Sequence, residues 1–263
     1  MITEREREKE REMVLPPNNY CLILDATKGN INVYVGPSKT AISDSDRPVI
    51  FDEETKRFKQ VPLDKAVKSF ATAPEGWYLV LKNPSANDKQ PNAGSASSLG
   101  DNGLLVGRKV NLPGPRSFPL WPGQMIKVIQ GHRLRSNQYL MVRVYDEEAA
   151  KKNLGEAVVK TTGESIGEQL IKEEDLIVGK VIVIKGTDVS FYIPPTGIEV
   201  LKIGGSYIQE AVTLERLEYC ILLDEDGNKR YIKGPSVVFP KPTEKFVNKY
   251  DNRKFRAREL SEI

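Results

Sequence analysis

The chain has little of what most enzymes and nucleic-acid binders depend on. Its 263 residues include one histidine and two cysteines, which disfavours both imidazole acid–base catalysis and a cysteine-rich zinc site. Lys and Arg number 39 and Asp and Glu 36, without the basic excess typical of a nucleic-acid binder. No apolar run has membrane-spanning length, and the charged start is the reverse of a secretory signal. These features predict no membrane association and a protein made in the cytoplasm.

What the sequence has instead is repetition. The stretch YCLILDATKGNINVYVGP, residues 20–37, returns in shortened form as YCILLDEDGNKRYIKGP, residues 219–235. In both, an apolar run ends at Asp, a Gly-Asn pair follows, and Gly-Pro closes the second run. Gly-Asn between apolar runs is a β-hairpin signal, because both residues tolerate positive φ. Cys21 and Cys220 occupy the same place in the two copies, and we expect each to fill a small strand position rather than form a disulfide in the cytosol.

Two looser copies lie between these hairpins. GWYLVLKNPS, residues 76–85, and YLMVRVYDEE, residues 139–148, each begin another Tyr-led strand, and each is followed by a closing turn in which glycine supplies backbone freedom. The hairpin tips vary. The loop 83–103 is rich in Ser, Gly and Asn, which is typical of a mobile loop, and Ser165–Leu176 could form a short helix. The residues predicted to form the closing turns are Gly36, Pro37, Gly114, Pro115, Gly186, Gly234 and Pro235.

The repeats predict an all-β fold, built as a string of small antiparallel β modules with a short charged N-terminal arm. Modules of this size bury little apolar surface alone, so neighbours must share the core. The predicted divisions are the arm at 1–13, a first module at 14–72, a second at 73–131 with the long loop 83–103, a third at 132–209 with the helical insertion, and a partial fourth module with a C-terminal tail at 210–263.

The arm, TEREREKERE at residues 3–12, alternates acidic and basic residues and has no apolar stripe to bury. As a helix it would place attractive pairs three residues apart but like charges four apart, and as a strand it would separate acids from bases. Two readings stay open: a solvated arm, or an arm that becomes ordered against a neighbouring subunit. The candidate interface residues are Arg5, Arg7 and Arg11 in the arm and His132, Arg133 and Arg135 in the segment HRLR.

No motif indicates catalysis or cofactor binding. DEDGNK, residues 224–229, superficially resembles a calcium loop but lacks the full set of oxygen ligands and the distal Glu, so a shared turn explains it better. LIVGKV at 176–181 and the glycine pair at 204–205 do not complete a phosphate loop. FPLWPGQ, residues 118–124, sets two aromatics between prolines, and we interpret it as a packed module corner. We therefore predict no catalytic, cofactor or metal site and no small-molecule substrate.

The order of these signatures resembles the N-terminal repeat region of the major vault protein family. In that family small antiparallel β domains stack end to end, and many copies stand side by side as the staves of a shell. The resemblance implies a structural role without catalytic residues. The segments that carry it are PPNNYCLILD (16–25), VYVGPSKTAISDSDRPVIF (33–51), APEGWYLVLKNP (73–84), FPLWPGQMIKVI (118–129) and VIVIKGTDVSFYIPPTGIEVLK (181–202).

Vault subunits are several times longer, and the chain has neither their shoulder domain nor their long cap helix. Short proteins with vault-like β repeats also occur in the virions of tailed bacteriophages. The resemblance therefore implies a non-enzymatic virion component of the neck, collar, tail or fibre attachment, assembled in the host cytoplasm. It would be a homo-oligomer with other virion or shell proteins as partners. The alternatives are a shell subunit of a cytoplasmic vault-like ribonucleoprotein particle, and a ligand-binding protein or enzyme that uses loop 83–103 as a lid.

Overall fold

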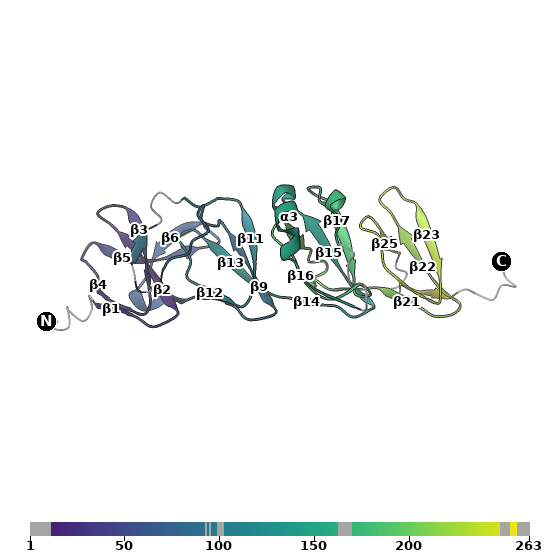
Figure 1. The fold of residues 1–263 in the computed structure, drawn as a ribbon, viewed down its shortest axis with the longest axis horizontal. Coiled ribbons are helices and arrows are strands. Elements are labelled where there is room, and N and C mark those ends of the chain that lie inside the picture. Colours follow the sequence, from purple (N-terminus) through teal and green to yellow (C-terminus); the bar gives the residue numbers. More distant parts are fainter. Residues whose placement is uncertain are drawn as a thin grey trace. The chain divides into compact units, whose positions relative to one another are not determined.

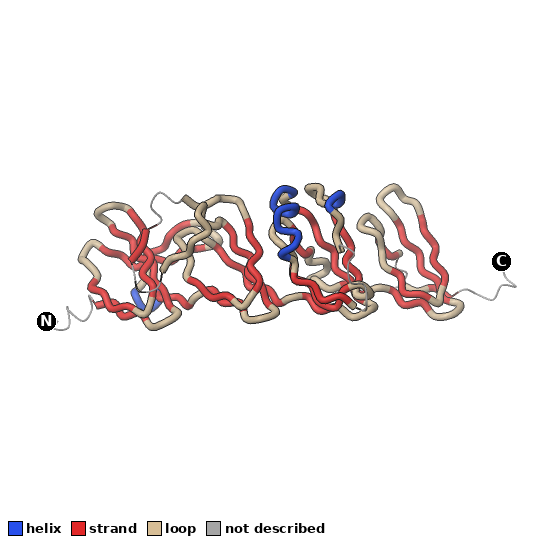
Figure 2. The backbone as a smooth tube through the Cα atoms, in the orientation of Figure 1, coloured by secondary structure: helices blue, strands red, loops and turns tan. Residues whose placement is uncertain are grey.

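The computed structural model describes residues 12–92, 94, 96–98, 103–162, 170–247 and 253–256. Small antiparallel sheets make up most of the described chain, as Figure 1 and Figure 2 show, and the predicted all-β fold is confirmed. The chain folds as two compact units, Met1–Gln130 and Gly131–Ile263. No helix among the described residues is long and apolar enough to cross a membrane.

The first unit contains two modules. The first module comprises β1 (Glu12–Leu15), β2 (Asn19–Asp25), β3 (Asn30–Val35), β4 (Ser38–Ala41), β5 (Asp46–Asp52), β6 (Arg57–Gln60), α2 (Leu63–Ala66) and β7 (Val67–Ser69). The second comprises β8 (Ala71–Ala73), β9 (Trp77–Lys82), β10 (Ala96–Ser98), β11 (Lys109–Pro113), β12 (Arg116–Phe118) and β13 (Met125–Gln130). Their central strands are β2, which pairs with β3, β5 and β7, and β9, which pairs with β11 and β13.

The second unit also contains two modules. The third module comprises β14 (His132–Arg133), β15 (Gln138–Val144), α3 (Glu147–Asn153), the 3-10 turn η1 (Leu154–Glu156), β16 (Val158–Thr161), the 3-10 turn η2 (Glu173–Asp175), β17 (Val181–Lys185), β18 (Val189–Ile193), β19 (Ile198–Val200) and β20 (Gln209–Glu210). The fourth comprises β21 (Val212–Leu214), β22 (Glu218–Leu223), β23 (Lys229–Lys233), β24 (Ser236–Val238), β25 (Lys245–Phe246) and β26 (Phe255–Arg256). The central strands are β15 and β22.

All four modules share one strand plan. A short first strand leads through a turn into the central strand, which forms a hairpin with the third strand of the plan, namely β3, β11, β17 or β23. The chain then returns to pair with the first strand. Later strands pair with the free side of the central strand. Successive side chains of a strand point to opposite faces of the sheet, so the continuous apolar run of β2 presents apolar residues to both faces.

In the first module the core lies on both faces of the central strand. In β2, Cys21 and Ile23 pack with Met13 in one cluster, whereas Leu22 packs with Val33 in another. Cys21 and Cys220 are both buried and free, and desolvation raises the pKa of Cys21 to about 12. The expectation that the cysteines fill small positions in strands is confirmed.

A closing glycine lies at the same point of every module, directly after the third strand of the plan. Its N–H donates to the carbonyl oxygen of the first residue of the central strand at 2.7–2.8 Å. A Cβ on any of these glycines would overlap with a carbonyl oxygen of the turn before the central strand. The glycines and the residues whose carbonyls they would meet are Gly36 with Pro16, Gly114 with Pro74, Gly186 with Arg135, and Gly234 with Glu215.

Because of this close approach, glycine is required at the closing turns for a different reason from the backbone freedom that the sequence suggested. None of the four has a left-handed φ, so backbone freedom is not what the position requires. It requires the absence of a side chain. The residues that follow are exposed, Pro37, Pro115 and Pro235 after cis peptide bonds and Thr187 in the third module.

The predicted arm and the predicted helix are placed differently in the structure. The arm was expected to span 1–13, but β1 begins at Glu12 and Met13 is buried. The helix of the third module is α3, where Asp146 accepts a hydrogen bond from the N–H of Ala149. The predicted helix at Ser165–Leu176 is wrong where it is described, because residues 170–176 contain only η2, and 163–169 lie outside the described residues.

The fourth module is more complete than expected. β21 pairs with β24, and β22 pairs with β23, β25 and β26. These are the pairings that define the plan in the other modules. The prediction of a partial module is therefore wrong, because short strands near the end of the sequence, such as β26 at Phe255–Arg256, still find their places on the central strand.

We predict that Gly36→Ala and Gly114→Ala each lower the free energy of unfolding by about 2 kcal/mol or more, because the backbone must shift to admit a methyl group. Gly103→Ala is the matched control, since it lies in the same unit and a Cβ there meets nothing within 4 Å. Urea unfolding followed by tryptophan fluorescence measures all three. Equal midpoints for Gly36→Ala and Gly103→Ala would contradict the proposed steric constraint.

In one of the turns before the central strands, Leu217 has a backbone conformation that a leucine side chain disfavours. Leu217 has φ 71° and is 63% exposed. The corresponding residues of the first two modules are Asn18, with φ 59°, and Gly76, with φ 77°. Asn and Gly adopt the left-handed region more readily than Leu, whose side chain crowds the carbonyl there. The fourth module therefore carries a local strain that its relatives in the chain avoid.

Leu217→Asn should raise the free energy of unfolding by about 1 kcal/mol, because it relieves this strain. Leu223→Asn is the control. Leu223 is 37% exposed on β22 and has no left-handed φ, so no gain is expected there. Urea unfolding of the two variants measures the difference. If Leu217→Asn is no more stable than the wild type, the left-handed backbone at this position is not a source of strain.

Candidate functional site

The modules differ in what covers the outer edge of their third strand. β11, β17 and β23 are outermost in their sheets, and among the described strands nothing pairs with their outer side. β3, the equivalent strand of the first module, is covered by β10 from the long loop of the second module. An outermost strand presents unpaired N–H and C=O groups to any extended chain that approaches. We call β11, β17 and β23 the open edges, and they are the candidate functional surface.

β10 belongs to the loop 83–103, which the sequence predicts to be mobile. Ala96 lies opposite Tyr34, and Ser98 lies opposite Asn32 on β3. The prediction is therefore wrong for β10, which extends a sheet of its own chain. Composition gives no sign of this, because Ala and Ser are not typical strand residues. Residues 93, 95 and 99–102 of the loop lie outside the described residues.

The loop before β10 is anchored by the corner FPLWPGQ. The indole N–H of Trp121 donates to the carbonyl oxygen of Lys89 at 2.8 Å, and the Ser85 hydroxyl donates to the same oxygen at 2.7 Å. Leu120 and Trp121 also pack against the core cluster of the first module that contains Val33. The interpretation of this segment as a packed corner is confirmed. The corner thereby joins the two modules of the first unit.

Charge distinguishes the open edges from the covered one. Lysine lies at an end of each open edge, with Lys109 on β11, Lys185 on β17, and Lys229 and Lys233 on β23. β3, with the sequence NINVYV, has no charged residue. Lysine on an outer strand opposes indiscriminate strand addition. The open edges are therefore protected from random association and suited to a partner of complementary charge.

His132, predicted as a possible interface residue, is buried. It is 4% exposed, and its ring meets that of Tyr207 nearly edge-on, with centroids 5.1 Å apart. The sequence allowed a surface position or a position between modules; the surface position is wrong, because alternation along β14 turns His132 inward and Arg133 outward, and the position between modules stays a prediction. Arg133 and Arg135 are both exposed. The other candidate interface residues, Arg5, Arg7 and Arg11, lie outside the described residues.

The turn DEDGNK is closed by its own hydrogen bonds. Asp224 Oδ1 accepts from the N–H of Asp226 at 3.1 Å and of Asn228 at 2.7 Å. In the first copy Asp25 Oδ1 accepts from the N–H of Thr27 at 2.9 Å. These are turns in which an Asp side chain caps the backbone that follows it. Among the described residues, no group of three or more His, Cys, Asp or Glu side chains is arranged to hold a metal ion.

The comparisons with known proteins add no family. No protein-family model matches the chain, and no curated protein matches it. The features that bear on function are therefore the repeated strand plan, the open edges and the cover that β10 provides for β3.

Stability should depend on pH through His132, whose pKa desolvation lowers from 6.5 to about 4. The unfolded chain binds a proton near pH 6.5 and the folded chain does not. Stability is thus complete above pH 6.5 and falls as the pH drops towards 4. The expected loss between pH 7 and pH 5 is about 2 kcal/mol, measured by urea unfolding.

His132→Phe is the matched variant, because it keeps an aromatic ring beside Tyr207 and removes the titrating group. The chain has a single histidine, so no other imidazole contributes in this range. The variant should lose less stability than the wild type between pH 7 and pH 5. If both proteins lose the same amount, His132 does not titrate as its burial requires.

Proposed function

We propose that this chain is a non-enzymatic structural protein that works as several copies side by side. The pairing of β10 with β3 is the observation that carries the proposal, because there the third strand of a module accepts an added strand on its outer edge. β11, β17 and β23 have the same place in their modules and no such cover among the described residues. A segment of a neighbouring copy would complete these edges in the way that β10 completes β3.

The two sides of a module are different, which favours a closed ring. In the second module β11 lies on one side of β9 and β13 on the other. Contact between one side of a copy and the opposite side of the next is heterologous, and such contacts close into a ring when the rotation allows it. The lysines of the open edges make the contact selective. They also make it salt-dependent, because screening weakens attraction between exposed charges.

The resemblance to vault repeats supports a more specific place for these copies. We infer a component of a tailed-bacteriophage virion, in the neck, collar, tail or fibre attachment, with other virion proteins as partners. A shell subunit of a cellular vault-like ribonucleoprotein particle is the alternative from the same resemblance. The two differ in symmetry, since a virion ring holds few copies and a shell holds many. Negative-stain images of the native particle distinguish them.

Tyr231→Lys on β23 tests the open edges. Tyr231 is 60% exposed and lies between Lys229 and Lys233, so a third lysine adds like charge to the edge. Each tagged variant is produced alongside the wild type in the native source, and its share in purified particles is measured by mass spectrometry. Tyr231→Lys should enter the particles roughly tenfold less than the wild type, the equivalent of about 1.4 kcal/mol.

Leu217→Lys is the matched control. It introduces the same side chain into the same module at similar exposure, 63%, but in a turn rather than on an open edge. It should enter particles as the wild type does. Particles with one copy of the chain overturn the side-by-side proposal. Equal incorporation of the two variants shows that β23 takes no part in the contact.

A further inference from the structure

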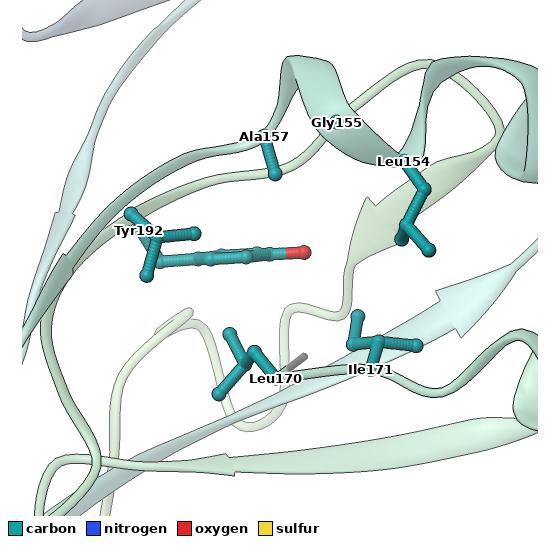
Figure 3. A pocket seen from close by; sticks show the side chains of 7 residues that line it. Leu154, Gly155, Ala157, Leu170, Ile171 and Tyr192 are labelled. Atoms are coloured by element: carbon teal, nitrogen blue, oxygen red, sulfur yellow. The ribbon is translucent and has the colours of Figure 1, made fainter. Parts of the chain in front are cut away.

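The third module contains a cavity that the shared strand plan does not account for. Its volume is about 170 Å³. The inserted segment η1–β16 supplies part of its wall, and the residues shortly before η2 supply another part. Among the described side chains that line it, one is polar. These side chains, shown in Figure 3, are Leu154, Ala157, Val159, Leu170, Ile171 and Tyr192.

Tyr192 enters the cavity from β18, the middle strand of its sheet. β18 pairs with β14 on one side and with β16 on the other, where Val159 lies opposite Tyr192. Tyr192 is 0% exposed, and its hydroxyl has no hydrogen-bond partner among the described residues. In Figure 3 the hydroxyl oxygen points into the space between Leu154 and Ile171.

A buried hydroxyl without a hydrogen-bond partner lowers the stability of the folded protein. Phe would fill the same position without that cost. Burial raises the pKa of Tyr192 above its usual value, so the hydroxyl stays protonated and keeps a hydrogen to donate. A buried water needs roughly two to four polar groups; among the described lining residues Tyr192 supplies the one polar side chain, and any further partner for a water must come from the backbone.

We propose that this cavity binds a small, uncharged, mainly apolar molecule whose oxygen accepts a hydrogen bond from the Tyr192 hydroxyl. An apolar cavity of about 150 Å³ is large enough for benzene, so a ligand of roughly six to eight non-hydrogen atoms fits. The described lining residues include no charged side chain, so an ion desolvated there has no compensation from them. The site is independent of the open edges and adds ligand binding to the proposed structural role.

Cyclohexanone and methylcyclohexane are the probes, because they have nearly the same shape and differ in a carbonyl oxygen against a methyl group. Each is titrated into the full chain with carbon-13-labelled methyl groups, and the methyl signals of Val159, Leu170 and Ile171 report binding. Cyclohexanone should shift these signals, and the preference, meaning the ratio of the affinity for cyclohexanone to that for methylcyclohexane, should be roughly tenfold higher in the wild type than in a variant without the hydroxyl, which is the difference that one hydrogen bond provides.

Two Tyr→Phe variants test whether the preference for cyclohexanone comes from the Tyr192 hydroxyl. Tyr192→Phe removes only the hydroxyl, so its preference should be roughly tenfold lower than that of the wild type, and it should melt no lower than the wild type. Tyr139→Phe is the control, because Tyr139 is also buried in the third module, at 5% exposure, but does not line the cavity. It should keep the wild-type preference for cyclohexanone. Ala157→Leu should fill the cavity and abolish binding of both probes.

The proposal is overturned if the wild type does not bind cyclohexanone at millimolar concentration, or if Tyr192→Phe keeps the wild-type preference. Loss of the preference in Tyr139→Phe overturns it too, because the effect then does not come from the hydroxyl in the cavity. If Ala157→Leu does not fold, the two Tyr→Phe variants can still be compared, and that comparison tests whether the Tyr192 hydroxyl binds the ligand.

Discussion

In every module, a backbone carbonyl before the central strand and the glycine after the third strand approach too closely for any side chain to fit between them. The hydrogen bond from the glycine N–H joins the two strands at the open end of their hairpin. From there the chain returns to its first strand, so the module closes on itself. The other end of the hairpin is free of this constraint, and it is the end at which the four modules differ.

The hairpin tips give the modules their individual properties. In the first and fourth modules an Asp side chain closes a short tip. In the second module the tip supplies β10 and covers the edge of β3. In the third module the tip holds α3, η1 and β16, which add a strand to β18 and build part of the cavity around Tyr192. Insertion at a tip is tolerated because the core and the closing glycine lie elsewhere.

The open edges and the covered edge follow one physical rule. An exposed strand edge has to be paired, charged or shortened, or it associates with any other edge. The first module pairs its edge with β10, and β3 needs no charge. The edges of β11, β17 and β23 carry lysine instead, and lysine on an outer strand opposes indiscriminate association. Selective side-by-side association is our proposal for these edges.

The sequence by itself determined the hairpins, the repeated modules and the packed corner at Phe118–Gln124, because alternation and turn residues act between neighbours along the chain. Only the tertiary structure decided that His132 is buried, that Tyr192 faces a cavity and that β10 pairs with β3. These outcomes depend on contacts between strands that lie far apart in the sequence. A local sequence pattern does not specify which distant strand or side chain a segment will pack against.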